Sequence, residues 1–305
     1  MPYFVKVPLE VFVILLGGLF VSRYLQGRGV AGWLESRFSP VFVRFGIPRE
    51  FVLIFFTSLV AGFAGEALLA LVLNEGRIDE RELIPGLMFI NFPVFFSFAP
   101  LVIAITVPLV GWVGLAYLCV QLFISLVVSL TGMLVFYRMR RAGSGRPVKS
   151  DLAEVAPEPK SAMEAFKESL RMSLRVSAVV MASLFVIHFL FKFGVMDVVK
   201  GFFSRIPLRC LSADVMSISL AHALHLAAGA VVAGRLMDLG LPPGKVLLGM
   251  VWGYVFGVPI RGLINILPRY TAMYGVKRGA RAWMFVQLFR GMVGVVVGLI
   301  LCGVV

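Results

Sequence analysis

Ionisable side chains occur inside apolar runs of this chain, where they need a structural or functional explanation. Glu66, His222, His225, Arg261 and Arg290 each lie within such a run. A charged group placed within a membrane-length apolar helix costs about 2.5–3.5 kcal/mol on insertion scales, so such groups are rare and usually have a role. These residue types offer ion or proton coupling through a carboxylate or imidazole, and solute binding through a guanidinium.

Arg261 is the strongest candidate for a binding residue. It follows Gly257 and Pro259 and precedes Gly262 and Asn265. Proline removes a backbone donor and glycine loosens a helix, so we expect a helix break here, with exposed backbone N–H and C=O groups that bind ions. The equally weighted alternative is an arginine that extends to the cytoplasmic interface and contacts only headgroups and water.

Uncharged polar side chains in other apolar runs complete the candidate substrate site. With Arg261, the candidates for substrate contact are Asn91, Ser97, Gln121, Asn265 and Gln287. The two glutamines are more simply explained as hydrogen-bonding groups between helices. Asn265 lies beside Arg261 at the expected break, and Asn91 and Ser97 lie in the other interrupted segment.

The remaining ionisable groups have structural as well as functional explanations. For Glu66, an ion pair that holds the bundle together and a role in coupling ions or protons are equally weighted. Arg290 has the same two alternatives, a structural and a coupling role. His222 and His225 are three residues apart and would share one helix face. Because no second ligand pair has metal-type spacing, hydrogen-bonded core histidines are favoured over a metal site.

The composition assigns the chain to the membrane. Of its 305 residues, 60% are hydrophobic and 15% are charged, compared with roughly 45–50% and 25% in soluble domains. The net charge is +13, but the Lys and Arg residues fall between apolar runs, which indicates headgroup contacts rather than nucleic-acid binding. The cysteines, Cys119, Cys210 and Cys302, lack metal or disulfide spacing, and no cofactor is expected.

Eight apolar segments have the length of a membrane helix. They are residues 7–25, 51–73, 86–110, 112–137, 174–193, 215–234, 246–267 and 282–305. We interpret the first as an uncleaved span, because no small-residue cleavage site follows it. Proline and glycine interrupt segments 86–110 and 246–267, and two amphipathic connectors, 33–45 and 195–208, are typical of helices that lie on the membrane surface.

The chain also repeats itself at a nearly constant spacing. Five anchors recur in the same order: Gly29-Val30 with Gly194-Val195, Gly76 with Gly240, Gly86 with Gly249, Gly111 with Gly275, and Val-Gln-Leu-Phe at 120–123 and 286–289. Internal symmetry of this kind is common among transporters. We therefore expect two transmembrane repeats, residues 1–137 and 169–305, joined by a polar linker at 138–168.

The distribution of basic residues favours inverted repeats. If segments 86–110 and 246–267 turn back or break, each half crosses three times, and most connecting Lys and Arg residues fall on the linker side. If both segments cross, the basic residues divide almost evenly between the two sides. Since cytoplasmic loops are enriched in Lys and Arg, the linker should be cytoplasmic, and the acidic turn at 75–82 should lie outside.

The sequence thus predicts an all-α polytopic protein of the cell membrane with two inverted structural repeats. Each repeat should contain three spans, one broken or re-entrant segment and one interfacial amphipathic helix. Irregular backbone at membrane depth must be buried in protein or line a wet cavity. One broken segment in each half therefore predicts a single shared site between the halves.

This pattern resembles the gate, or nucleoside-recognition, domain family. That domain occurs in concentrative nucleoside transporters, in spore-maturation membrane proteins and in the membrane part of ferrous-iron transport protein B. The resemblance covers residues 51–137 and 213–303 and depends on spacing and on Gly249, Gly257, Pro259, Arg261 and Asn265. It implies a gated membrane pathway, and it does not define nucleosides as the substrate.

Two functions remain open from the sequence. The first is a transporter or permease with a central solute site, for which a nucleoside-like or an ionic solute would suit. The alternative is a non-transporting membrane scaffold or assembly subunit. An enzyme is not expected, because Gly-Asp, His-Glu-x-x-His and paired-aspartate motifs do not occur. The expected partners are membrane lipids with anionic headgroups and a small solute or ion, with homo-oligomerisation left open and nucleic acid not expected.

Overall fold

The computed structural model describes residues 30–45, 47–60, 62–141 and 211–304, together with isolated positions between 9 and 20 and between 163 and 193. All regular elements in these ranges are helices. The spans expected at 7–25 and 174–193, the connector at 195–208 and most of the linker lie outside the described residues. The expectations for those segments remain predictions.

The described helices follow one another with short connections. In the first half they are α2 (Val30–Arg44), α3 (Arg49–Val60), α4 (Gly62–Asn74), α5 (Glu80–Phe89), α6 (Asn91–Ser97), α7 (Ala99–Val110) and α8 (Trp112–Arg141). In the second half they are α11 (Ala213–Leu224), α12 (Leu226–Asp238), α13 (Pro243–Arg261), the π-helical turn η1 (Gly262–Ile266), α14 (Leu267–Tyr274) and α15 (Val276–Val304).

Within the described part of the chain, three helices are long and apolar enough to cross a membrane. They are Trp112–Met139 within α8, Pro243–Arg261 and Val276–Val304. The pair α6 and α7 passes the same test together and is bent by 53° at the residue between them, so it forms either a fourth span, which is broken, or a re-entrant loop. These lengths support a membrane protein with transmembrane helices.

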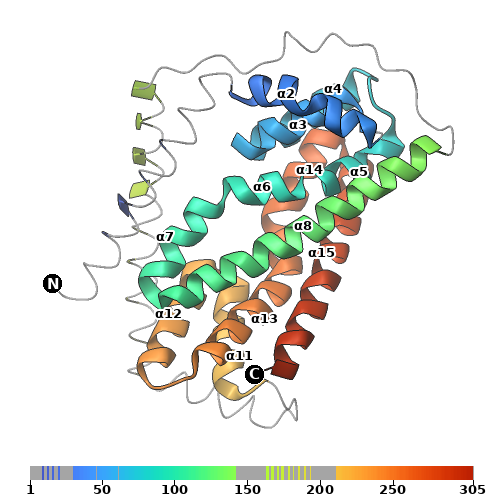
Figure 1. Ribbon diagram of the computed structural model, residues 1–305. Coiled ribbons are helices and arrows are strands. Elements are labelled where there is room, and N and C mark those ends of the chain that lie inside the picture. The colour runs from blue at the N-terminus through green and yellow to red at the C-terminus, as the bar shows by residue number, and fades with distance from the viewer. Residues whose placement is uncertain are drawn as a thin grey trace.

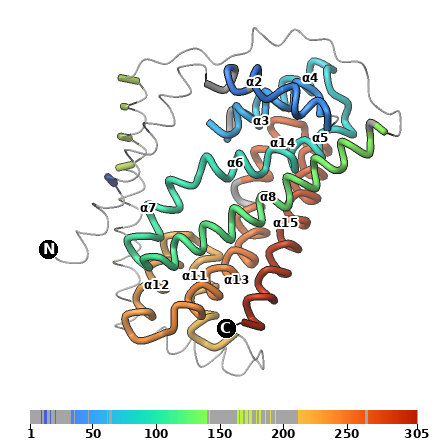
Figure 2. The backbone as a smooth tube through the Cα atoms, in the orientation of Figure 1, coloured from blue at the N-terminus to red at the C-terminus, as the bar shows by residue number. Residues whose placement is uncertain are grey.

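The short helices gather at the two ends of the long ones. Helices α2 to α5 and α14 lie at the upper end of Figure 1, and α11 and α12 lie at the lower end. The tube in Figure 2 shows the long helices α8, α13 and α15 running between these two groups. Two apolar cores follow the same division, one around Phe51 and Phe136 and the other around Ile218 and Met250.

Segments 51–73 and 215–234 are not single spans, which corrects the sequence interpretation. In each segment a helix of 12 residues is followed, after one intervening residue, by a helix of 13 residues. In the second segment the intervening residue is His225, whose backbone is extended (φ −154°, ψ 136°). A helix of 13 residues is about 20 Å long, too short to cross roughly 30 Å of hydrocarbon.

Close backbone contacts show that each of these helix pairs folds back on itself. A Cβ atom added to Gly65 would lie 2.9 Å from the Cα of Ser58, and one added to Gly229 would lie 2.5 Å from the Cα of His222. Residues seven apart in a straight helix are separated by about 10 Å along its axis. Pairs α3–α4 and α11–α12 are therefore helical hairpins, and glycine permits the close approach of their two arms.

Segment 86–110 is broken, as the sequence predicts. Pro93 has no N–H to donate to the carbonyl of Phe89 one helical turn earlier. The hydroxyl of Ser129 on α8 donates a hydrogen bond to this carbonyl instead. A second irregularity at Phe98 produces the bend between α6 and α7. Helix α8 thus supplies the hydrogen bond that the proline removes.

Segment 246–267 is not broken, contrary to the expectation for Pro259 and Gly262. Backbone dihedral angles at Arg261 and Gly262 remain right-handed helical, and residues Gly262–Ile266 form a π-helical turn. A π-helical turn accommodates an extra residue without ending the helix, and it often marks a functional position. Arg261 therefore lies directly before a bulge in a continuous helix rather than at a chain break.

The order of elements in the first half recurs in the second. Both halves contain a hairpin of 12-residue and 13-residue helices, an irregular helical segment and a final helix of 30 or 29 residues. In the described part of the chain, the glycines with positive φ are Gly76, Gly111, Gly240 and Gly275. Only glycine adopts such angles readily, which explains why these repeat anchors are glycine in both halves.

The acidic turn at 75–82 lies at the same end of the bundle as the turn between α14 and α15. Arg278, near the start of α15, forms an ion pair with Glu80. The arrangement deduced from the sequence placed the acidic turn and the basic residues 269–281 on opposite sides of the membrane. This ion pair contradicts that placement. The two hairpins are elements that fold back on themselves in the described part of the chain.

Candidate functional site

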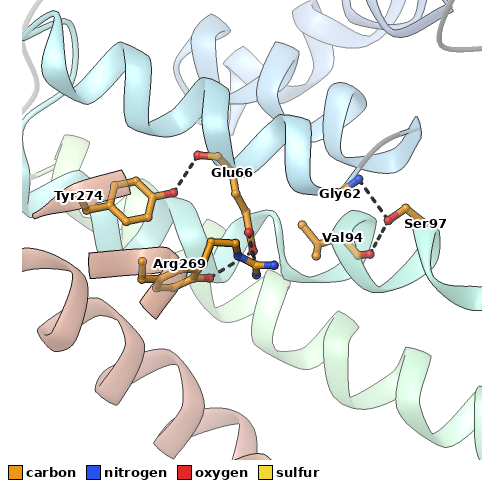
Figure 3. A network of polar contacts seen from close by, with 7 residues as sticks. Gly62, Glu66, Val94, Ser97, Arg269 and Tyr274 are labelled. Carbon is orange, nitrogen blue, oxygen red and sulfur yellow. Dashed lines mark hydrogen bonds and ion pairs between the residues drawn. The ribbon is translucent and has the colours of Figure 1, made fainter. Parts of the chain in front are cut away.

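The turn of the first hairpin is held by Ser97, one of the residues that the sequence singled out. The Ser97 hydroxyl accepts a hydrogen bond from the Gly62 N–H at 3.2 Å and donates one to the Val94 carbonyl at 2.7 Å (Figure 3). A Cβ atom on Gly62 would lie 2.6 Å from this hydroxyl. The hairpin turn therefore contacts α6 immediately before the bend at Phe98.

Glu66 links the first hairpin to the second half of the chain. Its side chain is 5% exposed, and Nη2 of Arg269 lies 2.8 Å from Oε2 and 3.2 Å from Oε1. The Tyr270 hydroxyl donates to Oε1 at 3.4 Å, and the Tyr274 hydroxyl donates to the Glu66 backbone carbonyl at 2.8 Å (Figure 3). The paired structural role considered for Glu66 thus has its arginine on α14.

The three partners of Glu66 were not among the candidates from the sequence. Arg269 lies near the basic residues that precede α15, a place typical of a connecting turn, whereas the structure places it within α14. Tyr270 and Tyr274 are one helical turn apart, a spacing that places both on one face of the helix. That spacing was the available signal, but it does not reveal a partner about 200 residues away in the sequence. We refer to these residues as the Glu66 cluster: Glu66, Arg269, Tyr270 and Tyr274.

His222 links the second hairpin to the first half. Its side chain is fully buried, and Nε2 lies 2.8 Å from the Tyr117 hydroxyl on α8. Cβ atoms added to Gly229 or Gly253 would lie within 2.5 Å of the His222 Cβ, so the imidazole is enclosed by its own hairpin and by α13. This environment agrees with the hydrogen-bonded core histidine favoured from the sequence.

His225 does not share a helix face with His222, contrary to the sequence expectation. Helix α11 ends at Leu224, and His225 is the exposed turn residue that caps α12. Its Nδ1 atom accepts a hydrogen bond from the Ala227 N–H at 3.2 Å. An N-terminal cap satisfies a backbone donor that would otherwise lack a partner. His225 therefore stabilises the turn of the second hairpin.

Arg290 joins the final helix to the irregular segments of both halves. Its Nε donates a hydrogen bond to the Tyr254 hydroxyl on α13. Its guanidinium lies 5.3 Å from the centre of the Tyr254 ring and 5.8 Å from that of Phe95 on α6. Cation–π contacts of this kind contribute up to about 2 kcal/mol when they are removed from water. Helices α6, α13 and α15 thus converge on one arginine.

Arg261 is partly buried and folds back along α13. Its Nε lies 3.5 Å from the Gly257 carbonyl, and a Cβ atom on Gly257 would lie 2.5 Å from its guanidinium. Tyr254 is two helical turns earlier on the same face. The Arg261 charge is close enough to act on Tyr117, His222 and Tyr254. These contacts define the arginine cluster: Tyr117, His222, Tyr254, Arg261 and Arg290.

The other predicted site residues are distributed over the same helices. Asn91 begins α6, is nearly buried, and its side-chain oxygen has no hydrogen-bond partner in the described part of the chain. Gln121 on α8 and Gln287 on α15 occupy equivalent repeat positions, and both are buried. Asn265 lies in η1, and its side chain is outside the described set. No hydrogen bond joins the described side chains of Asn91, Gln121 and Gln287 to one another.

Comparison with known proteins identifies relatives without an assigned function. The chain is 24% identical over 285 residues to the uncharacterized protein MJ0871 of Methanocaldococcus jannaschii, an alignment that covers 90% of this chain and 87% of that protein. It is 22% identical over 285 residues to the uncharacterized protein MJ0880 of the same organism, covering 90% of each chain. No family model matches the chain. No solved structure matches it significantly. The chain is therefore similar to archaeal proteins of comparable length, and its function must be argued from the site.

Proposed function

We propose that this chain is a solute transporter of the cell membrane built from two inverted repeats, with its solute site between the hairpins and the irregular helices. One observation carries the proposal. Each hairpin packs against the irregular helical segment of its own half: Gly62 bonds to Ser97 before the bend, and His222 lies against Gly253 of α13, the helix that leads into η1. Ser97 and Arg261 are separated by the same spacing as the repeat anchors Gly111 and Gly275.

Irregular backbone within a bilayer needs protein or water around it. Hairpin turns, bends and π-helical turns place incompletely bonded polar groups at depth, which is tolerated only in buried or wetted surroundings. Transporters use such elements, at the interface of their repeats, to form the solute site. A packing scaffold would require neither two hairpins nor a cluster of charged side chains beside them. The gate family suggested by the sequence remains part of this proposal.

The hairpins also provide the inverted topology. A re-entrant hairpin returns to the side from which it entered, so each half would cross three times, through its first apolar segment, its irregular segment and its long helix. Relative to the sequence-based arrangement, Arg77 and Arg81 move to the linker side while Arg235 and Lys245 leave it. The excess of basic residues on the linker side is unchanged, so the positive-inside rule still favours a cytoplasmic linker.

Labelling of single cysteines should place the two hairpin loops on opposite sides of the membrane. In a background in which Cys119, Cys210 and Cys302 are replaced, we expect Leu239→Cys to react with an impermeant maleimide on intact cells. Glu75→Cys and Ser150→Cys should react only after the cells are opened. Reaction of Leu239→Cys and Glu75→Cys from the same side would contradict the inverted arrangement.

A reversible cross-link at the first hairpin turn should block transport. The Gly62 Cβ position lies 2.6 Å from the Ser97 hydroxyl, which brings the two Cβ positions within the roughly 4 Å that a disulfide requires. We expect Gly62→Cys/Ser97→Cys to cross-link on oxidation and to lower solute flux into proteoliposomes by at least about tenfold. Reduction should restore the flux, because the hairpin must leave α6 for solute to pass.

The flux assay should use uridine, inorganic phosphate, acetate and Mn²⁺ as test solutes, because these represent the neutral and ionic classes left open by the sequence. The single variants Gly62→Cys and Ser97→Cys, treated with the same oxidant, control for the substitutions themselves. Unchanged flux in the fully cross-linked double variant would contradict a moving hairpin. Absence of flux for all four test solutes would favour the alternative function, a non-transporting membrane scaffold.

A further inference from the structure

Two arginines, Arg261 and Arg290, lie on helices that are long enough to cross a membrane. Arg290 is the central residue of α15, which has 29 residues, so it lies about 21 Å from either end. Arg261 is the last of the 19 residues of α13 and is followed by η1 and α14. It therefore lies about 27 Å from the start of α13 and about 20 Å from the end of α14. Arg290 is thus central in its candidate span, whereas the candidate span of α13 ends at Arg261.

Neither arginine is paired with a carboxylate in the described part of the chain. Arg290 contacts the Tyr254 hydroxyl and two aromatic rings, and Arg261 contacts the Gly257 carbonyl. Glu66 is within electrostatic range of Arg290, but its carboxylate already bonds to Arg269 at 2.8 Å. A buried charge without a counter-charge is costly. The arginine cluster thus carries an excess of positive charge.

Hydrogen-bond donors are also in excess at this place. The Tyr254 hydroxyl accepts a hydrogen bond from Arg290, and its own proton has no acceptor among the described residues, although the side chain is buried. Arg261 uses one N–H group in a long contact with Gly257. A guanidinium has five N–H donors and no acceptor. The cluster therefore combines unused donors with unneutralised positive charge.

We infer that the arginine cluster binds an oxyanion, a phosphate or carboxylate group, between Arg261 and Arg290, with the Tyr254 hydroxyl as a further donor. Planar guanidinium groups suit such ligands because they donate two parallel hydrogen bonds to two oxygens. This inference rests on the proposed transport function and assigns its solute to the anionic class. A lipid phosphate has the same chemistry, and the test below separates it from a free anion by comparing nanodiscs of different lipid.

The test measures binding to the full chain in nanodiscs of phosphatidylcholine. Inorganic phosphate and acetate serve as probes, uridine is the neutral comparison, and sodium chloride controls for ionic strength. We expect phosphate or acetate to raise the thermal unfolding temperature in a saturable manner. Arg261→Gln and Arg290→Gln should weaken the affinity at least tenfold, and Arg261→Lys should weaken it less, because charge is kept while bidentate geometry is lost.

Two further variants separate binding from folding. Tyr254→Phe removes a single hydroxyl and should lower the affinity with little change in fold. Arg278→Gln removes an exposed arginine that pairs with Glu80 and should leave the affinity unchanged. Without ligand, Arg261→Gln should unfold at the same temperature as the parent chain or higher, because it removes an unneutralised charge. A merely structural arginine would instead lower that temperature.

The outcomes distinguish this inference from the proposed function. No saturable response to phosphate or acetate, or equal affinity in the parent chain and both glutamine variants, overturns the oxyanion site. Saturable binding and flux of uridine without anion binding would leave transport standing and remove the oxyanion assignment. Arginine-dependent stabilisation by phosphatidylglycerol nanodiscs alone would retain the oxyanion site as a lipid site and contradict the transport of an anion.

Discussion

Replacing Arg269 with glutamine should lower the free energy of unfolding by about 3 kcal/mol, because it leaves the buried Glu66 carboxylate without a charged partner. The Glu66 side chain is 5% exposed and that of Arg269 is 25% exposed. Breaking a buried pair costs about 3–5 kcal/mol, and the partial exposure of Arg269 places the expected value at the low end. Denaturation of the detergent-solubilised protein, followed by circular dichroism, measures the change.

The chain provides a matched control for this substitution. Arg278 pairs with Glu80, and these side chains are 48% and 59% exposed. Exposed pairs contribute roughly 0–1 kcal/mol, so Arg278→Gln should change stability only slightly. The double variant Glu66→Gln/Arg269→Gln should recover part of the loss, because no uncompensated charge remains. Equal small effects of Arg269→Gln and Arg278→Gln would show that the Glu66 cluster does not hold the hairpin.

Replacing Gly229 with alanine should destabilise the second hairpin by about 2–3 kcal/mol, because the new methyl group overlaps the facing helix. The added Cβ would lie 2.3 Å from the Cβ and 2.5 Å from the Cα of His222. Two helix backbones would have to separate, and the His222 bond to Tyr117 would shift with them. The same denaturation assay measures the loss, and near-ultraviolet circular dichroism reports the environment of Tyr117.

Gly291 provides the control for this second prediction. It lies within α15, and a Cβ atom there would meet its nearest neighbour, Val258, at 3.9 Å, which is ordinary contact. Glycine in a helix interior costs about 0.8–1.0 kcal/mol relative to alanine, so Gly291→Ala should be neutral or stabilising. If Gly229→Ala behaves like Gly291→Ala, α11 and α12 do not pack against each other as closely as the hairpin requires.

Both hairpins are attached to the opposite half of the chain. Glu66 of the first hairpin bonds to Arg269 and Tyr270 of the second half, and His222 of the second hairpin bonds to Tyr117 of the first. Both hairpins also contribute buried residues to the apolar cores. Elements that move in function come from regions of lower local stability, so the strength of these contacts limits how readily a hairpin moves. Arg269→Gln and Gly229→Ala therefore measure the strength of contacts that a transport cycle with moving hairpins would have to break.

The sequence alone determined the features that depend on local composition. The length of its apolar runs specifies membrane helices, since about 20 apolar residues are needed to span a bilayer. The anchors Gly76, Gly111, Gly240 and Gly275 could be found from spacing alone, because their positive φ angles require glycine at those positions. Ser97, Glu66, Arg261 and Arg290 were identified because polar groups in apolar runs are costly wherever the helices finally pack.

Only the tertiary structure decided which segments turn back. Segment 51–73 is as apolar as a membrane span, because a hairpin that is buried in protein needs no polar loop. The turn within this segment is revealed only by the contact between Gly65 and Ser58. Pro259 did not break its helix, since the π-helical turn η1 absorbed the distortion. The pairing of Glu66 with Arg269 joins residues about 200 positions apart. Local propensity acts over one or two helical turns, so contacts at that separation are set by how the helices pack and not by the pattern along the chain.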